Sequence, residues 1–396
     1  MRQVRKRRSA VVVGLVVALG LAGCSRDSVN FSQYPGFAAY FSAHPRSSRL
    51  PDAGERALLE RHRPRWQLPL SHPGAIAFYE DYIANGTLVS GDGRARFDRV
   101  TRAILNGHRD DSGAVFTHRP PVGTVPPAVV FARIDRAPLA AEAEAGCVTV
   151  LTYHAVFRSS GLPAGFGGLG AGALGLVANL DDWHQLDHYT AVTIVLDAAA
   201  APVALMLQQH NMTHTWVLGF DLPAPDDGRP AIDVALRSNE LYPHQPGRMR
   251  HRTIQFPTPE GIRYLLGYGD APFMSADDVT DGAVEADYAL GFLPHDDAFY
   301  DFQGRLGARR RLPGRDGPPG ADFNTLPELK PLYLQLAVGY WREGNRDDLE
   351  TAERSFGRTG DPLDFARAQL PVLMGSLRRV SPSIATADCD PPTKGR

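Results

Sequence analysis

Short apolar runs separated by turn residues fill the middle of the chain, from residue 126 to about 269. These runs are rich in Val, Ile, Leu, Tyr and Trp, residue types that favour extended and half-buried structure. They predict strands over 128–134, 147–157, 189–197, 202–210, 213–220 and 231–237. Because tight connections separate several of these runs, we expect antiparallel hairpins that fold into a β-sandwich core.

Helical periodicity flanks this core on both sides. The pattern predicts helices over 73–83 and 94–105 before the strands, and over 324–341 and 361–380 after them. Residues 270–324 read as loop-rich, with Pro, Gly, Asp and aromatic side chains. The expected fold class is therefore α+β, an antiparallel β-sandwich with N- and C-terminal helices packed on it.

The first 24 residues have the layout of a bacterial secretory signal. Five basic residues precede an apolar run from Ala10 to Gly20, which is too short to span a bilayer as a helix. Leu21-Ala22-Gly23-Cys24 then reads as a lipobox, which predicts cleavage before Cys24 and lipid attachment to it. Two or more acyl chains give stable anchoring. Ser25, in place of Asp, favours the outer membrane over the inner, so we expect a lipid-anchored envelope protein facing the periplasm.

The predicted organisation follows from these patterns. It comprises a signal peptide (1–23), a lipidated tether (24–50), an N-terminal helical segment (51–125), the sandwich core (126–270), a loop-rich and helical C-terminal segment (271–385) and a tail (386–396).

The charge of the chain bears on its binding partners, and its cysteines bear on disulfide formation. Without the five basic residues of the signal, the mature chain keeps 37 basic against 44 acidic residues, a net charge of −7. An acidic body argues against nucleic acid as a partner. Once Cys24 is acylated, Cys147 and Cys389 remain as an even pair in an oxidising compartment, which predicts a disulfide between them; two buried free thiols are the alternative.

Two catalytic signatures can be set aside. Residues 170–175 match the Gly-x-Gly-x-x-Gly spacing and Asp197 follows, but a linker separates the preceding strand from the first glycine, which the dinucleotide fold does not allow. We expect instead an apolar, glycine-rich loop over 165–176. The chain contains no Gly-x-Ser-x-Gly elbow, although a triad spread along the sequence stays open.

Histidine and carboxylate residues concentrate around the second and third predicted strands. Imidazole and carboxylate groups are ordinary zinc ligands. The candidate metal or ligand residues are His154, Asp182, Trp183, His184, Asp187, His188, His210 and His214. The spacing of His210 and His214 would put both rings on one face of a helix, but about 13 Å apart in a strand. Hydrogen-bonded histidines at the rim of a sandwich are the alternative interpretation.

The order of motifs around these residues resembles two β-sandwich families. Asp182-Trp183-His184 leads into the strand 189–197, Gln209-His210 ends the next strand, and 230–240 runs into Tyr242-Pro243-His244. This order is similar to the vacuolar-protein-sorting-like and necrosis-inducing-protein-like families over about residues 182–244. The resemblance implies a sandwich. The families carry Gly-Asp-Trp-Glu and a Ser-His ending, where this chain has Asp181, His184 and Asn239. In the necrosis-inducing members the Asp-Trp-Glu region contributes to a divalent metal site; His184 in place of Glu makes calcium or magnesium a poorer fit.

Three functions are compatible with these features. The favoured one is a non-catalytic envelope protein that binds a partner or an envelope polymer at the rim formed by Trp183, His184, His188 and His210. The alternative is a metal-dependent hydrolase of an envelope polymer or ester, in which His184, Asp187, His188 and His210 hold zinc and metal-bound water attacks. A membrane-active, toxin-like sandwich using the loop 165–176 is the third. Enzymatic activity is therefore uncertain, with binding preferred.

Overall fold

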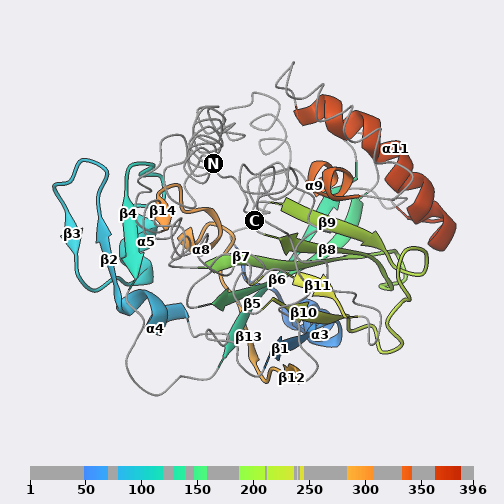
Figure 1. The fold of residues 1–396 in the computed structure, drawn as a ribbon, viewed down its shortest axis with the longest axis horizontal. Helices are drawn as coiled ribbons and strands as arrows, with labels where there is room; N and C mark the ends of the chain where they lie inside the picture. The colour runs from blue at the N-terminus through green and yellow to red at the C-terminus, as the bar shows by residue number, and fades with distance from the viewer. Residues whose placement is uncertain are drawn as a thin grey trace, which may run out of the picture.

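The computed structural model of the chain describes residues 49–69, 79–118, 128–139, 147–157, 187–209, 212–235, 239, 241–244, 283–306, 332–340 and 362–384. The signal peptide, Cys24, the tether up to residue 48, the loop 165–176 and the tail lie outside these residues. The described part is rich in β-structure, with three sheets and few helices (Figure 1), so the α+β class is confirmed.

A six-stranded sheet forms the centre, in the order β13-β5-β6-β7-β8-β9. Its strands are β5 (Val129–Pro138), β6 (Cys147–Phe157), β7 (Asp187–Leu196), β8 (Pro202–Gln209), β9 (Met212–Val217) and β13 (Ala289–Gly291). Successive strands from β5 to β9 pair antiparallel, as the hairpin pattern predicts. The sheet is nevertheless mixed, because β13 joins β5 in parallel.

Two four-stranded sheets flank the centre, in the orders β11-β10-β1-β12 and β14-β4-β2-β3. The first contains β1 (Arg65–Pro69), β10 (Ala231–Val234), β11 (Leu241–Pro243) and β12 (Ala283–Glu285). The second contains β2 (Gly86–Val89), β3 (Arg96–Phe97), β4 (Val115–His118) and β14 (Arg305–Leu306). Strand β1 runs parallel to β10 and β14 runs parallel to β4, so an entirely antiparallel core is wrong.

The described helices are α3 (Ala53–Arg61), α4 (Tyr79–Ala84), α5 (Arg102–Gly107), α8 (Ala298–Asp301), α9 (Leu332–Gly339) and α11 (Pro362–Val380). The helix predicted over 361–380 is confirmed by α11. The helix predicted over 94–105 is wrong in its first half, where Arg96–Phe97 form β3 and Thr101 caps the shorter α5. The N-terminal segment expected to be helical also carries β1 to β4.

One apolar core lies between the six-stranded sheet and the sheet of β1. It contains Leu151 and Tyr153 from β6, Trp66 from β1, and Ile232 and Val234 from β10, all fully or almost fully buried. We call the face of the six-stranded sheet that enters this core the inner face. Side chains alternate along a strand. The residues of β6 and β10 that neighbour these core residues in sequence therefore point away from the core.

The opposite face of the six-stranded sheet, here called the helix face, meets two other apolar clusters. At one end Val148 and Val150 of β6 pack with Leu336 of α9 and Leu373 of α11. At the other end Phe131 of β5 and Val156 of β6 pack with the segment that contains α8. Figure 1 shows α9 and α11 beside β8 and β9, and the sheet of β2 to β4 at the far end of the molecule.

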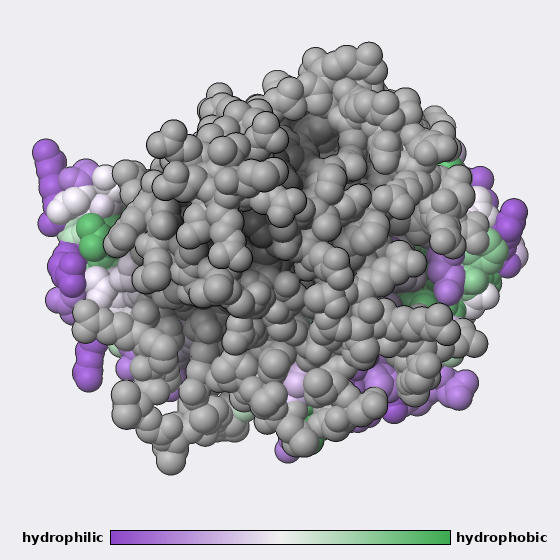
Figure 2. Space-filling model, viewed as in Figure 1, coloured by the Kyte–Doolittle hydropathy of each residue, from purple (hydrophilic) through white to green (hydrophobic). Residues whose placement is uncertain are grey.

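The described surface is largely polar. The end that carries β2 and β3 shows mainly hydrophilic colouring in Figure 2, consistent with the exposed ion pairs Arg94–Asp92 and Arg96–Asp98. Large exposed apolar side chains lie singly on separate segments: Leu50, Val284 and Val372. Among the described helices, none has the length and apolar character needed to cross a membrane.

A capping box begins α3. Glu55 N–H donates to Asp52 Oδ1, and Asp52 N–H donates to Glu55 Oε2, both at 2.9 Å. The Glu55 carboxylate also accepts hydrogen bonds from the two terminal guanidinium nitrogens of Arg49, at 2.6 Å from Nη1. The Arg49 hydrogen bond is the main cause that lowers the pKa of Glu55 below its usual value.

Replacing Glu55 with Gln should reduce stability only above the unfolded-state pKa of a glutamate, about 4.3. The lowered pKa in the folded state means that the stabilisation is present above that pH and disappears as the pH falls through the folded-state pKa. Arg49 is mostly exposed, so we expect a loss of about 1 kcal/mol or less at pH 7. Urea unfolding of Glu55→Gln and wild type at pH 7 and pH 3 measures this. Equal differences at both pH values would contradict it.

Candidate functional site

The structure locates only part of the predicted histidine and carboxylate cluster. Asp182, Trp183, His184 and His210 lie outside the described residues. Asp187 and His188 begin β7, where the backbone but not the side chains is described. His154 and His214 are described in full.

His154 lies on β6 and is completely buried. Its ring meets the rings of Phe299 and Tyr300 edge-on, with centroid distances of 5.7 and 5.3 Å. It pairs in register with Phe131 of β5 and Ala191 of β7, which places its side chain on the helix face.

His214 lies on β9, where its ring stacks on that of Trp216 at a centroid distance of 3.8 Å. Its register partner on β8 is Leu207, which belongs to the inner core, so His214 is on the inner face. Burial lowers the pKa of His214 to about 3, and the ring is therefore neutral at ordinary pH.

His154 and His214 therefore cannot bind one ion together. They point to opposite faces of the sheet and lie three strands apart, about 14 Å at the usual strand spacing. A metal site that uses both residues is wrong. Within the described ranges, no group of three or more His, Cys, Asp or Glu side chains is arranged to hold a metal ion.

A row of mostly polar side chains crosses the helix face instead. Paired register connects residues on five adjacent strands: Arg133, Thr152, Thr193, Met206 and Thr215. All five are buried. On β5 and β6 the row lies between the two apolar clusters of the helix face, whereas on β8 its member Met206 belongs to the cluster that contains α9 and α11.

Two hydroxyl groups in the row have no hydrogen-bond partner within the part of the chain that the structure describes. Among the described residues, Oγ1 of Thr193 and Oγ1 of Thr215 are buried and make no hydrogen bond, although Thr193 is only 2% and Thr215 only 1% exposed. The backbone of Thr215 is bridged to Tyr340 at the end of α9. A buried hydroxyl without a hydrogen bond costs about 1–3 kcal/mol. A bound polar molecule that makes the missing hydrogen bond removes this cost, so such atoms favour binding.

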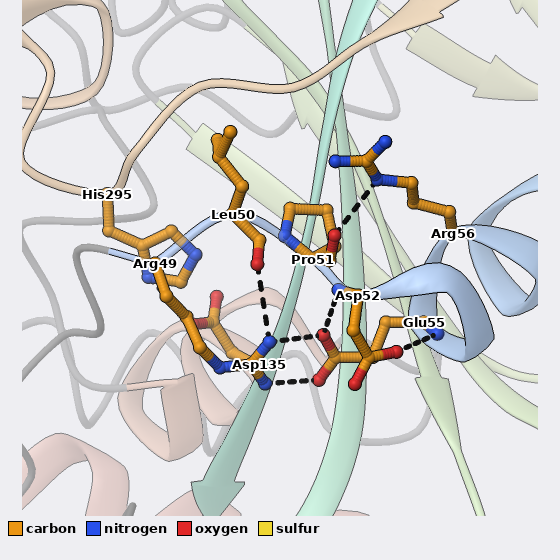
Figure 3. A network of polar contacts seen from close by, with 8 residues as sticks. All are labelled: Arg49, Leu50, Pro51, Asp52, Glu55, Arg56, Asp135 and His295. Carbon is orange, nitrogen blue, oxygen red and sulfur yellow. Dashed lines mark hydrogen bonds and ion pairs between the residues drawn. The ribbon is translucent and has the colours of Figure 1, made fainter. Parts of the chain in front are cut away.

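A charged cluster lies at the β5 end of the row. Nη2 of Arg133 is 3.1 Å from Oδ2 of Asp135, and Oδ1 of Asp135 is 3.2 Å from Nδ1 of His295. The Arg133 guanidinium also stacks over the ring of Tyr300, 5.2 Å from its centroid. Figure 3 draws Asp135 and His295 in the same close-up as the Arg49–Glu55 pair at the start of α3. The cluster therefore brings a cation, a carboxylate and an imidazole to the edge of the row.

Sequence reasoning missed most of these residues. The signal at Arg133 and Asp135 is two charges with a spacing of two in an apolar strand, which places both on one face. His295 comes from the segment expected to be loop-rich, and only the fold brings it to β5.

Cys147 begins β6 with little exposure and is disulfide-bonded. The other two cysteines of the chain, Cys24 and Cys389, lie outside the described residues. The pairing of Cys147 with Cys389 therefore stays a prediction.

Comparison with known proteins gives no family to which the chain belongs. No family model matches the sequence, and neither a curated protein nor a solved structure matches it significantly.

Proposed function

We propose that this chain is a lipid-anchored protein of the bacterial outer membrane that faces the periplasm and works by binding. The lipobox that ends at Cys24 supports the anchor. The single observation that supports binding is the cross-strand row, in which the buried hydroxyls of Thr193 and Thr215 have no hydrogen-bond partner among the described residues. The proposed ligand is a small polar molecule that donates or accepts hydrogen bonds along the row, beside the Arg133 cluster.

The proposal includes a β-sandwich made of the six-stranded sheet and the sheet of β1, β10, β11 and β12. The apolar core shared by these two sheets supports this arrangement. The metal-dependent hydrolase and the membrane-active toxin rest on His184 and the loop 165–176, where no described observation favours either.

Thr193→Val and Thr215→Val should each abolish ligand binding, because they remove the hydroxyl with little change in side-chain volume. The test is native mass spectrometry of the full lipoprotein, extracted from the envelope in mild detergent. We expect wild type to carry a small additional mass that both variants lose. The control Thr149→Val, at a partly exposed position near the start of β6, should retain this mass. No additional mass on wild type, or equal mass on all variants, would contradict the proposal.

The same substitutions predict opposite effects on stability in the two states. In ligand-free protein, Thr193→Val should raise the free energy of unfolding by about 1 kcal/mol, because it removes a buried hydroxyl without a partner. In ligand-loaded protein it should lower stability, since binding stabilises only wild type. Thermal unfolding before and after ligand removal measures both. If Thr193→Val destabilises both states equally, the hydroxyl has a structural role and the row is not a ligand site.

A further inference from the structure

The sheet of β1, β10, β11 and β12 carries a polar group on the face that points away from the shared core. Along β10, Ile232 and Val234 enter the core, so Ala231 and Asp233 lie on the other face. His244 follows β11, which pairs antiparallel with β10. Nδ1 of His244 lies 2.7 Å from Oδ1 of Asp233.

Burial differs sharply between these two partners. The Asp233 side chain is 5% exposed, whereas that of His244 is 36% exposed. Burial is the main cause that raises the pKa of Asp233, and the hydrogen bond from His244 opposes it. A buried carboxylate at Nδ1 fixes the orientation of the ring, which leaves Nε2 to exchange a proton with a ligand. Among the described residues, none hydrogen-bonds to His244 Nε2.

A cationic side chain, Arg65, lies two strands away from His244 on the same face of the sheet. The backbone N–H of His244 donates to the carbonyl of Ala231 at 2.9 Å, and Ala231 pairs on its other side with Arg65 of β1. His244 and Arg65 therefore flank the small side chain of Ala231, about two strand spacings or ~10 Å apart. Nε of Arg65 is buried and has no hydrogen-bond partner among the described residues.

Two further polar side chains lie on this face, Gln67 of β1 and Glu285 of β12. Gln67 pairs with Asp233 in register and donates from Nε2 to Glu285 Oε2 at 3.5 Å. Nη1 of Arg65 lies 3.9 Å from Oδ2 of Asp227. Tyr242, which pairs with Asp233 in register, is a buried titratable group on the same face, and Asp227 and Glu285 lie nearby.

We propose that the outer face of this sheet is a hydrolytic site for carboxylic esters, with His244 as general base and Arg65 as the cation that stabilises the oxyanion. A water molecule over Ala231 gives a proton to His244 Nε2 as its oxygen bonds to the ester carbonyl carbon. The carbonyl electrons move to oxygen, beside Arg65. When they return, the C–O bond to the alcohol breaks and His244 gives its proton to the departing alkoxide. The products are a carboxylic acid and an alcohol, and Asp233 keeps its carboxylate throughout as a positioning residue.

The site is independent of the cross-strand row. It lies on a different sheet and shares none of the row residues. The activity therefore goes beyond the proposed binding function, and Thr193→Val leaves it unchanged.

The test is hydrolysis of 4-nitrophenyl acetate by the full lipoprotein in detergent. General acid–base catalysis contributes typically 10²–10⁴-fold, so we expect His244→Gln to lower kcat/KM by at least about 100-fold. Arg65→Gln should lower kcat more than it raises KM, because it removes an interaction made to the developing oxyanion. His108→Gln, which changes a partly exposed histidine on α5's C-cap, is the matched control and should keep the wild-type rate.

Asp233→Asn tests the positioning role. We expect a loss of about tenfold or more in kcat/KM together with a changed pH–rate profile, which a purely structural effect on folding would not produce. Circular dichroism and thermal unfolding confirm that each variant is folded. A wild-type rate equal to that of His244→Gln would overturn the proposal, as would an Asp233→Asn variant with the wild-type rate and pH profile.

Discussion

His214→Phe should make the protein markedly less sensitive to acid. In the folded state, burial holds the pKa of His214 at about 3, whereas an unfolded histidine titrates near 6.5. Between about pH 6.5 and pH 3, His214 is therefore protonated in the unfolded state and neutral in the folded state. Stability is fully present above about pH 6.5 and falls by up to about 1.4 kcal/mol per pH unit as the pH decreases toward 3. Phe keeps the aromatic stack on Trp216 and removes the titration.

The measurement is the free energy of unfolding in urea at pH 7.5 and pH 4.5 for wild type, His214→Phe and His214→Gln. Other carboxylates weaken all three proteins in acid, so the difference between variant and wild type is the quantity that matters. We expect that difference to shift in favour of both variants by roughly 2.7 kcal/mol between the two pH values. His214→Gln separates charge from stacking, because it lacks the ring but also lacks the proton. If the difference does not change with pH, the histidine ring is accessible to water in the folded state.

His214 also shows why the candidate metal cluster could not be assembled from sequence. His154 and His214 belong to strands predicted at nearly the correct positions, β6 and β9. Nearness in sequence suggested one site, but the face on which a strand residue lies depends on register, and a shift of one residue reverses it. The register is set by which face enters the apolar core, and here it separates the two histidines.

The strands themselves were predictable because their signal is local. Alternating or continuous apolar runs bounded by turns predicted β5 to β10, and successive hairpins gave the antiparallel order β5 to β9. The parallel pairs β1–β10 and β13–β5 join segments more than 150 residues apart. The local sequence of neither segment predicts which strand it pairs with, because this pairing depends on the apolar surface that the whole chain buries.

The same limit applied to Asp233 and His244. The sequence shows Asp233 between two apolar residues of a predicted strand, which is the pattern of a carboxylate on the face away from the core. That pattern alone does not give its partner. The pair forms because β11 runs antiparallel beside β10, and the residue after β11, His244, then lies next to Asp233.

Trp66→Ala should give the largest loss of stability of any substitution discussed here. Trp66 is completely buried in the core between the six-stranded sheet and the sheet of β1. Its ring meets that of Phe157 on β6 edge-on, with a centroid distance of 6.5 Å. Truncating a buried Trp to Ala removes its transfer free energy and leaves a cavity, which costs about 3–5 kcal/mol. Trp66→Phe keeps most of the contact area and should cost less than half as much.

The form of the transition distinguishes a shared core from two independent layers. If the two sheets fold as one sandwich, Trp66→Ala lowers the urea midpoint of the whole protein, and backbone circular dichroism and aromatic fluorescence change together. If they fold separately, the variant unfolds the sheet of β1 first and the two probes give different midpoints. A double-mutant cycle with Phe157→Ala adds a direct measure, because edge-on aromatic pairs couple by about 0.5–1.5 kcal/mol. Coupling of that size means that residues from different sheets stabilise each other, which is the physical content of the sandwich proposal; coupling near zero, with separate transitions, removes it.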